Sequence, residues 1–368
     1  MGTMSPQSHC RCWVEVDLDA LRSNIIAIRR RIGHARLMAV VKADAYGHGL
    51  VPVARTLRQC GVDAFAVANL TEALALRQVI GPDLLILQFG AAFPFEIDAM
   101  LANNITPTIS SLGEARQFEQ SATRRVDVHV EIDTGMGRCG FWHGEAATAL
   151  QQLATFRHLQ VAGVYTHFPS ADENLAETRR QLADFVAVAR GYPLLHAANS
   201  AALLTLPEAM LDMVRPGLAL YGIAPGAKDF MPALSFKARV AHVKTVAAGR
   251  TISYGQTFVA PATMRIATIA AGYADGFNRH LSHKAEVLVA GQRCQVVGRV
   301  TMDQIMVDVT GVPHVNFSDE VVFIGRQGTA VITANEVAGW SGTIAWEVLC
   351  GTNQSVRVPR IYQRTEPA

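Results

Sequence analysis

Eight short apolar runs, separated by stretches with the pattern of helices, most restrict what this chain can fold into. The stretches Thr71–Arg77 and Gln181–Arg190 are two of the predicted helices. Eight alternating strand and helix units predict an α/β protein with an N-terminal (β/α)8 barrel of the TIM type. A doubly wound sheet is the alternative, but no GxGxxG follows a first strand. The eight runs are Leu37–Val41, Ala64–Val67, Leu84–Leu87, Thr106–Ile109, Val126–Ile132, Val161–Tyr165, Leu194–His196 and Met213–Val214.

The pattern changes after Pro232, where strand-like alternation with turn signals replaces the alternation of strands and helices. Phe236–Val240 and Val321–Ile324 are two of the runs that predict strands there. A chain of 368 residues is also long for one compact domain. We therefore predict a barrel over residues 13–232 and a mostly β domain over residues 233–368.

The composition argues against several classes of function. Hydrophobic residues make up 50% of the chain and charged residues 17%, which is typical of large cores rather than disorder. The net charge of +2 gives no reason to expect binding to nucleic acid or to a membrane surface. No apolar run approaches the roughly 18 residues that span a bilayer. The N-terminal stretch MGTMSPQSHCRCW lacks an apolar signal core, so we expect a short disordered leader and a cytoplasmic protein.

The cysteines and histidines form no recognisable metal or disulfide pattern. The six cysteines are scattered, without a CxxC pair, which favours reduced thiols over disulfides. The twelve histidines do not combine with the cysteines at the spacing of zinc sites. We therefore predict no metal.

Polar and glycine residues follow the predicted strands at their C-terminal ends, where barrels of this type keep their catalytic residues. Lys42 ends the first apolar run. Burial at that place would lower the pKa of its amine and let it form a Schiff base with an aldehyde cofactor. Taken alone, a lysine at a strand end more often extends its amine into solvent. The other strand ends supply Asp133–Arg138, Thr166 with His167, Asn199 with Ser200, and Arg215–Leu218.

The loops after the seventh and eighth strands often bind phosphate in barrels. Here they supply the Ser200 hydroxyl and the backbone N–H groups around Gly217, where the missing Cβ permits close approach. Ordinary turn chemistry explains either loop alone. Both loops together, with Lys42 at the first strand, favour a phosphate-bearing cofactor.

Eight motifs occur in the order found in alanine racemases: KADAYGHG, TGMGRCG, YTHF, HAANS, VRPGLALYG, SYGQTF, GYADG and GRVTMDQ. The chain resembles that family from Trp13 to the RVPR stretch at Arg357–Arg360. Its members depend on pyridoxal 5'-phosphate (PLP) and have a barrel followed by a β domain. The resemblance implies an isomerase that interconverts L-alanine and D-alanine. Supply of D-alanine for peptidoglycan and catabolism of amino acids both fit this activity.

The resemblance also implies the residues around the cofactor. Lys42 would carry PLP and Arg215 would face the pyridine nitrogen. His167 would lie near the ring and orient Arg215. The other cofactor-binding residues would be Asn199 and the phosphate-holding group of Tyr46, Ser200 and the backbone of Gly217 and Leu218.

Racemisation requires removal of a proton from one face of the α-carbon and its return to the other face. The resemblance assigns these steps to Lys42 and to Tyr254, which the β domain of a partner subunit would supply. The implied assembly is a homodimer with shared active sites. Taken singly, these side chains have ordinary alternatives: buried tyrosines, a core histidine, a surface arginine and a turn-capping aspartate. The substrate-binding residues implied are Arg138, the backbone at Met302, and Tyr273 and Asp303 at the entrance.

Two positions depart from the family pattern. Many members carry a carbamylated lysine where this chain has Glu131. We expect the native carboxylate to orient Arg138 by a charge-assisted hydrogen bond, without modification. Some relatives have a tyrosine just before the RVPR stretch, where the run here is Gly351–Val356. A roomier or more polar pocket there makes a serine or broad-specificity amino acid racemase the alternative.

Two further kinds of PLP-binding barrel are disfavoured. A decarboxylase of basic amino acids would need a phosphate loop with consecutive glycines, and no such run is found. A non-enzymatic PLP carrier consists of a single domain, which disagrees with the β domain expected after Pro232.

Overall fold

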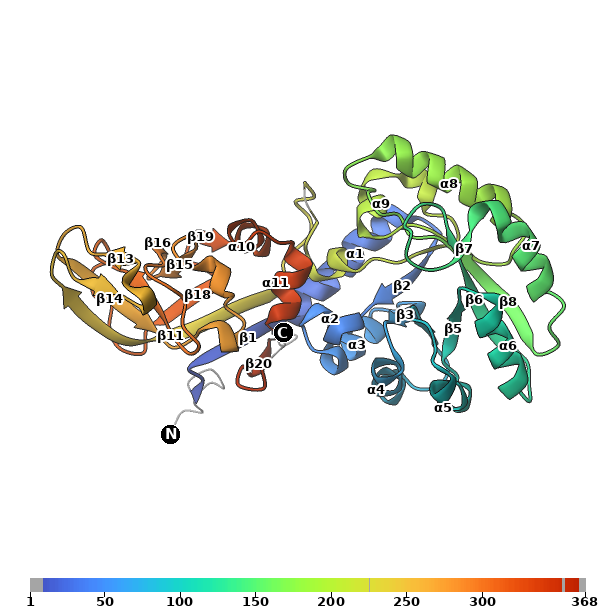
Figure 1. The fold of residues 1–368 in the computed structure, drawn as a ribbon, viewed down its shortest axis with the longest axis horizontal. Helices are drawn as coiled ribbons and strands as arrows, with labels where there is room; N and C mark the ends of the chain where they lie inside the picture. Colours follow the sequence, from blue (N-terminus) through green and yellow to red (C-terminus); the bar gives the residue numbers. More distant parts are fainter. Residues whose placement is uncertain (1–8, 225, 353–354, 364–368) are drawn as a thin grey trace. The chain divides into compact units, whose positions relative to one another are not determined.

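The computed structural model describes residues 9–224, 226–352 and 355–363, which form two compact units (Figure 1). The barrel unit consists of Ala20–Ala45 and Leu50–Met231 within that range. The C-terminal unit consists of the described parts of Met1–Asp19, Tyr46–Gly49 and Pro232–Ala368. The chain therefore passes from the first unit to the second next to Pro232, where the sequence pattern changes.

Eight parallel strands close into a ring in the barrel unit, which confirms the predicted fold class. Each strand pairs with the next, and the last strand, β10, pairs with the first, β2. Each predicted run coincides with one strand to within two residues at either end. The ring consists of β2 (Arg36–Val40), β3 (Ala64–Val67), β4 (Leu85–Gln88), β5 (Thr106–Ile109), β6 (Val126–Asp133), β8 (Leu159–Tyr165), β9 (Leu195–His196) and β10 (Met213–Val214), while β7 (Phe141–Trp142) pairs beside β6.

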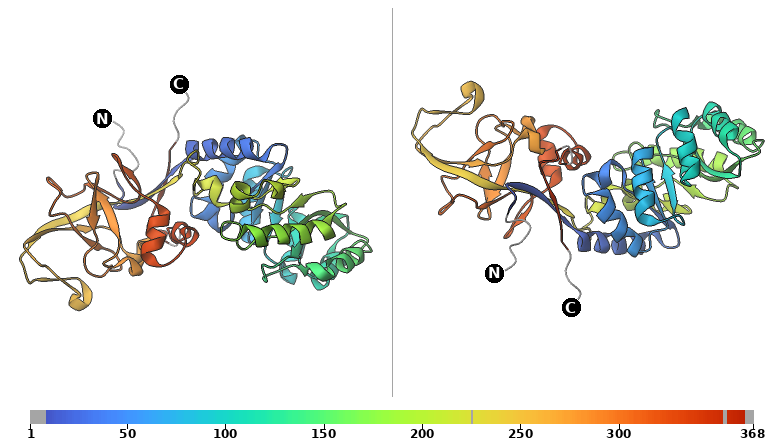
Figure 2. Two further views of the ribbon diagram at one scale, coloured as in Figure 1. Left: turned by 90° about the horizontal axis from the view of Figure 1, so that it is seen from above. Right: turned by 90° about the horizontal axis from the view of Figure 1, so that it is seen from below.

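Helices surround the ring of strands (Figure 2). Four of them begin at a side-chain cap: Asn69, Ser111, Asn174 and Asn199 each accept a hydrogen bond from the backbone N–H three residues later. The helices are α1 (Leu18–Ile32), α2 (Lys42–Tyr46), α3 (Leu50–Gln59), α4 (Leu70–Ile80), α5 (Ile97–Ala102), α6 (Leu112–Ser121), α7 (His143–Leu153), α8 (Leu175–Ala189) and α9 (Ser200–Thr205), with 3-10 turns η2 (Pro94–Glu96), η3 (Pro207–Ala209) and η4 (Leu218–Tyr221).

The C-terminal unit is built on one long strand, β11 (Leu234–Val246). This strand pairs antiparallel with β1, β14 and β18, and β1 pairs in parallel with β20. The unit is mostly β, as predicted. Its strands are β1 (Cys12–Asp17), β11, β12 (Thr251–Ile252), β13 (Phe258–Val259), β14 (Met264–Ile269), β15 (Glu286–Val289), β16 (Gln292–Gln295), β17 (Ile305–Asp308), β18 (Glu320–Gln327), β19 (Ala330–Ile332) and β20 (Arg360–Gln363). Its helical elements are η5 (Tyr254–Gln256), η6 (Tyr273–Asp275), η7 (Arg279–Leu281), α10 (Ala334–Ser341) and α11 (Ala345–Gly351).

The expectation of a disordered leader is wrong from Arg11 onward. Trp13 is 1% exposed, and its Nε1–H donates to the Glu15 carboxylate at 2.8 Å. Glu15 also pairs with Lys237 of β11 at 2.9 Å. Lys237 lies more than 200 residues further along the chain, so the local composition of the segment could not indicate its order.

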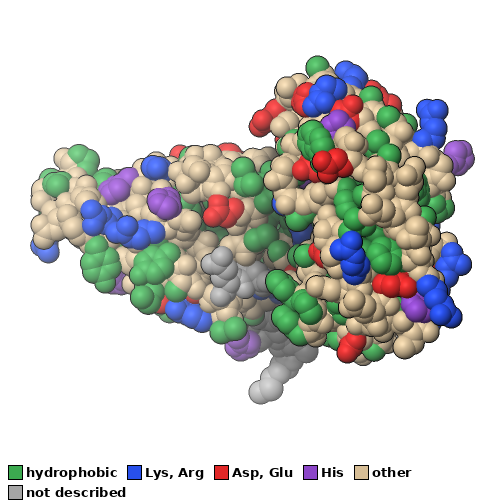
Figure 3. Space-filling model, turned by 45° about the vertical axis from the view of Figure 1, so that its right-hand side comes forward, with side chains coloured by type: hydrophobic (Ala, Val, Ile, Leu, Met, Phe, Trp, Pro, Cys, Tyr) green, Lys and Arg blue, Asp and Glu red, His purple; other side chains and the backbone are tan. Residues whose placement is uncertain are grey.

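Basic and acidic side chains are interspersed on the face of the barrel unit shown in Figure 3. No helix in the described part of the chain is long and apolar enough to cross a membrane. The same residues contain no group of three or more His, Cys, Asp or Glu that could hold a metal ion.

Candidate functional site

Lys42 lies two residues after the end of β2 and immediately before a left-handed turn. The φ angles are 52° at Ala43, 52° at Asp44, 56° at Ala45 and 53° at Tyr46. Residues with a Cβ avoid this conformation because the Cβ crowds the following carbonyl oxygen. Surrounding contacts must therefore hold the turn in place.

Two carboxylates supply these contacts within the barrel unit. Glu72 accepts hydrogen bonds from the backbone N–H of Ala43 at 2.6 Å and of Ala68 at 2.9 Å. Asp44 accepts from the N–H of Leu50, the first residue of α3. The backbone at Lys42 is thereby tied to the starts of α3 and α4.

The glycines of the KADAYGHG motif have a packing role that the sequence did not reveal. Gly47 and Gly49 have φ angles of 80° and 92°. A Cβ at Gly47 would overlap the carbonyl oxygen of Leu349, and one at Gly49 would overlap the Tyr362 hydroxyl. The segment Tyr46–Gly49 therefore packs within the C-terminal unit, and its Tyr46 side chain is buried.

Ser200 joins the two predicted phosphate loops. Its Oγ accepts hydrogen bonds from the backbone N–H of Gly217 at 2.9 Å and of Ala219 at 3.2 Å. Asn199 precedes it as the cap of α9, and its Nδ2 donates to the carbonyl oxygen of Phe168 at 3.2 Å. The two N–H groups thus converge on the Ser200 hydroxyl, and concave backbone of this kind binds anions such as phosphate.

Arg215 follows β10 and is 3% exposed. Nη1 donates to Nδ1 of His196 at 2.9 Å and to the His196 carbonyl oxygen at 2.7 Å. Nη2 donates to the carbonyl oxygens of Thr166 at 2.6 Å and Ala197 at 3.2 Å. Among the described contacts, the Nε–H is thus the donor that Arg215 leaves uncommitted. Burial lowers the pKa of Arg215 to about 10, so it stays protonated at neutral pH.

Arg215 is oriented by the hydrogen bonds that it donates to His196, whereas the resemblance implied that His167 would orient it. β9, which ends at His196, is the neighbour of β10 in the ring, whereas His167 follows β8, one strand further away. Burial, together with Arg215, Arg138 and Lys42, lowers the pKa of His167 to about 3 and leaves its imidazole neutral. Its place near a cofactor ring stays a prediction.

A second buried histidine, His129 on β6, contacts His196 with its Nδ1 2.8 Å from Nε2. Burial lowers the pKa of His129 to about 3 and the pKa of His196 well below its usual value, with Arg215 adding to both effects. Both imidazoles are therefore neutral at neutral pH.

These two histidines predict a loss of stability in acid. Unfolded histidines bind protons as the pH falls through about 6.5, while the folded ones do not until the pH nears their lowered pKa values. The unfolded state then binds more protons, so the fall in the free energy of unfolding should approach about 1.4 kcal/mol per pH unit for each histidine once the pH is below about 6. Urea unfolding of the wild type and His129→Asn between pH 7 and pH 5 measures this slope. The slope of the free energy of unfolding against pH should be smaller in the variant by the contribution of one histidine. An unchanged slope would contradict the lowered pKa of His129 in the folded protein.

Glu131 on β6 is 3% exposed and bonds a residue that the sequence did not single out. The Tyr165 hydroxyl donates to its Oε2 at 3.2 Å, and Thr108 lies 3.0 Å from the same hydroxyl. Burial raises the pKa of Glu131, and the positive charge of Arg138 opposes that rise. No hydrogen bond joins Glu131 to Arg138 among the described contacts, so its orienting role stays a prediction.

The other four predicted site residues lie in the C-terminal unit and are exposed. Tyr254 is 71% exposed, Met302 51% and Tyr273 42%, and Asp303 is exposed as well. Tyr254 begins η5, which follows β12.

Backbone contacts join the two loops that carry three of these residues. The N–H of Tyr273 donates to the Thr301 carbonyl oxygen at 3.0 Å, and the N–H of Ala274 donates to that of Met302 at 3.0 Å. A Cβ at Gly272 would overlap the backbone of Thr301 and Met302. The loop that carries Tyr273 therefore packs directly on the turn that carries Met302 and Asp303.

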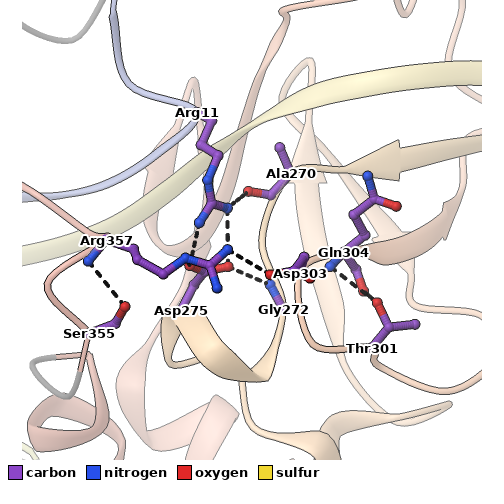
Figure 4. Close-up of polar contacts among 9 residues, drawn as sticks. All are labelled: Arg11, Ala270, Gly272, Asp275, Thr301, Asp303, Gln304, Ser355 and Arg357. Atoms are coloured by element: carbon purple, nitrogen blue, oxygen red, sulfur yellow. Dashed lines mark hydrogen bonds and ion pairs between the residues drawn. The ribbon is translucent and has the colours of Figure 1, made fainter.

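A buried carboxylate that the sequence did not reveal anchors this pair of loops. The Asp275 side chain is fully buried and receives Nη2 of Arg11 at 2.6 Å and Nη1 at 3.1 Å (Figure 4). Its Oδ2 also accepts from the N–H of Gly272 at 3.1 Å. Arg357 lies 3.7 Å from Asp275 and donates to Asp303 at 2.6 Å. Arg11, on the expected leader, is thus part of the support for these loops.

The stretch before Arg357 is partly described. Asn353 and Gln354, which belong to the run that lacks the family tyrosine, lie outside the described residues. Val356 is fully exposed.

The fold and these contacts define an α/β-barrel protein that carries a lysine, a hydroxyl joined to two backbone N–H groups and a buried arginine at the C-terminal ends of its strands. Two family models match the chain: "Alanine racemase, N-terminal domain" over residues 16–225 and "Alanine racemase, C-terminal domain" over residues 233–362. The chain belongs to the alanine racemase family.

Individual relatives agree with this membership. The alanine racemase of Carboxydothermus hydrogenoformans is 43% identical over 95% of this chain and 99% of its own length. That of Symbiobacterium thermophilum is 44% identical over 95% and 96%. The crystal structure of alanine racemase from Bacillus anthracis with bound L-Ala-P has a TM-score of 0.88 and 38% identity, covering 98% of this chain and 96% of that one. The enzyme of Bartonella henselae with covalently bound pyridoxal phosphate has a TM-score of 0.89 and 27% identity, covering 96% and 100%.

Proposed function

We propose that this protein is a PLP-dependent racemase that interconverts L-alanine and D-alanine by a two-base mechanism. The observation that carries the proposal is the set of groups at the C-terminal strand ends of a family member: Lys42 after β2, Ser200 with Gly217, and the uncommitted Nε–H of Arg215. The matches to alanine racemases over nearly the whole chain support it.

The residues present fit PLP. The Ser200 hydroxyl and the N–H groups of Gly217 and Leu218 would hold its phosphate, with Tyr46 and Asn199 completing the set. Lys42 would hold it covalently, and Arg215 would donate its Nε–H to the pyridine nitrogen. Because Arg215 keeps its own proton, that nitrogen would stay an acceptor. When bound, PLP supplies an electron sink for the α-carbon of an amino acid.

Two side chains would move the proton of the α-carbon. Nζ of Lys42 would serve one face and Oη of Tyr254 the other. Arg138 and the N–H of Met302 would bind the substrate carboxylate, a group that suits a guanidinium. Both Arg138 and Met302 are exposed, so each can meet a ligand.

The enzyme would work as a homodimer. Tyr254, Tyr273, Met302 and Asp303 are exposed on the C-terminal unit, and a second copy would place them against its own barrel mouth. Cys12, Cys60, Cys139 and Cys294 are thiols, which suits the cytoplasm as the compartment.

Glu131 would support Arg138 through its charge. Glu131→Gln keeps an acceptor for the Tyr165 hydroxyl and removes that charge. A raised KM for alanine with unchanged kcat is expected, whereas unchanged substrate affinity would count against the role.

A serine or broad-specificity racemase is the second candidate. The observation that favours it is the short, exposed Val356 just before Arg357, where some relatives have a tyrosine. The test is a chiral assay of a panel of L-amino acids with the PLP-loaded enzyme. Alanine should react fastest; faster turnover of serine would favour the second candidate, and inversion of neither would overturn both.

A further inference from the structure

A line of buried polar side chains runs across three strands behind Arg215. His196 ends β9, next to β10, and His129 lies on β6, with β8 between them in the ring. On β8, Gly163 lies opposite His129 in the strand register. A Cβ at Gly163 would lie 2.7 to 2.8 Å from the imidazole of His129. The glycine therefore lets that ring cross β8 and reach His196 at 2.8 Å.

The contacts fix the tautomer of both imidazoles. A guanidinium has donors and no acceptor. Because Nη1 of Arg215 donates to Nδ1 of His196, that nitrogen carries no proton and the proton lies on Nε2. Nε2–H then donates to Nδ1 of His129, which places the proton of His129 on its own Nε2. That last nitrogen is buried and has no hydrogen-bond partner among the described residues.

We propose that His129 is a positioning residue for Arg215: by accepting the Nε2–H of His196, it holds His196 in the tautomer that receives Nη1. The inference rests on the proposed function, since it concerns the arginine that would meet PLP. His129 and His196 are each fully buried, so water cannot replace the acceptor. Without it, the Nε2–H of His196 is buried with no acceptor in the tautomer that receives Nη1, so that tautomer loses part of its advantage over the Nδ1–H form. The contact with His196 would then no longer hold the guanidinium of Arg215, and with it the Nε–H, in one direction.

The imidazole of His129 occupies the place that a Cβ at position 163 would take, so the glycine on β8 and the histidine on β6 fit each other. The Tyr165 ring stacks on His196 at 4.9 Å between centroids and further restricts its rotation. The tautomer, rather than the ring position, is therefore the property that His129 controls.

The first test measures the tautomers directly in the wild type. Two-bond ¹H–¹⁵N NMR spectra of PLP-loaded full-length enzyme, labelled with ¹⁵N-histidine, should show His196 and His129 as neutral Nε2–H forms at pH 7. Signals of the two residues are identified by their loss in His196→Asn and His129→Asn. An Nδ1–H form or an imidazolium at His196 would overturn the proposal, and this measurement requires no catalytic activity.

The second test compares two variants of His129. Asn keeps an acceptor near the place of Nδ1, while Leu removes it. The dissociation constant of PLP should rise about tenfold in His129→Leu, with kcat lowered about tenfold and KM unchanged, and both should stay within about twofold in His129→Asn. Equal PLP affinity in the wild type and a folded His129→Leu would overturn the proposal. A wild type that binds PLP with the expected tautomers and leaves alanine unchanged would instead overturn the proposed function alone.

Discussion

Tyr254→Phe is expected to lower the rate of alanine racemisation by about 10²- to 10⁴-fold, the usual contribution of a positioned acid or base. The substitution keeps the ring and removes the hydroxyl that would exchange a proton with one face of the α-carbon. Lys42 would still serve the other face. One enantiomer should therefore continue to exchange its α-hydrogen with D₂O without inversion, which NMR of the incubated amino acid measures.

The matched control is Tyr273→Phe, which removes a hydroxyl from the neighbouring exposed tyrosine of the same unit. Its effect should fall mainly on KM, since Tyr273 belongs to the entrance. Racemisation by Tyr254→Phe within tenfold of the wild type would contradict the two-base mechanism.

Asp275→Asn is expected to lower the free energy of unfolding by about 3 kcal/mol, because it removes the buried charge that receives Arg11. For a chain region of this size the melting temperature should fall by about 10 °C. The loops of Tyr273 and Met302 rest on this carboxylate, so KM for alanine should rise as well. Differential scanning calorimetry and initial rates measure the two effects.

Asp303→Asn provides the comparison for that prediction. Asp303 pairs with the same Arg357, but its side chain is 54% exposed. Exposed ion pairs contribute about 1 kcal/mol or less, so the melting temperature should change little. Equal melting temperatures for Asp275→Asn and the wild type would show that the buried pair does not hold the loops.

The barrel could be predicted because the sequence features that indicate it are local. Strands buried on both faces are short continuous apolar runs, and a catalytic residue at a strand end is adjacent to its run in sequence. Lys42, Ser200 and Arg215 were found in this way.

The remaining features depend on segments that are distant in sequence. Arg11 gains its partner Asp275 only when β1 joins β11, and Arg215 finds His196 only because β9 and β10 are neighbours in the ring. His196 and Asp275 both stand in recognised motifs, HAANS and GYADG, yet nothing in those letters shows what each side chain bonds. The left-handed turn after Lys42 is equally hidden, because alanine and aspartate are ordinary residues of right-handed helices.

That turn has a consequence for the chirality of the chain itself. From Ala43 to Tyr46 the backbone has the handedness that a polypeptide of D-residues adopts spontaneously. Ala43 is exposed, so its methyl group can change direction without losing packing. A semisynthetic protein with D-alanine at this one position should be more stable than the natural chain by about 1 kcal/mol. Within this turn, D-alanine, which this enzyme is proposed to produce, fits the backbone better than the L-alanine that the chain contains.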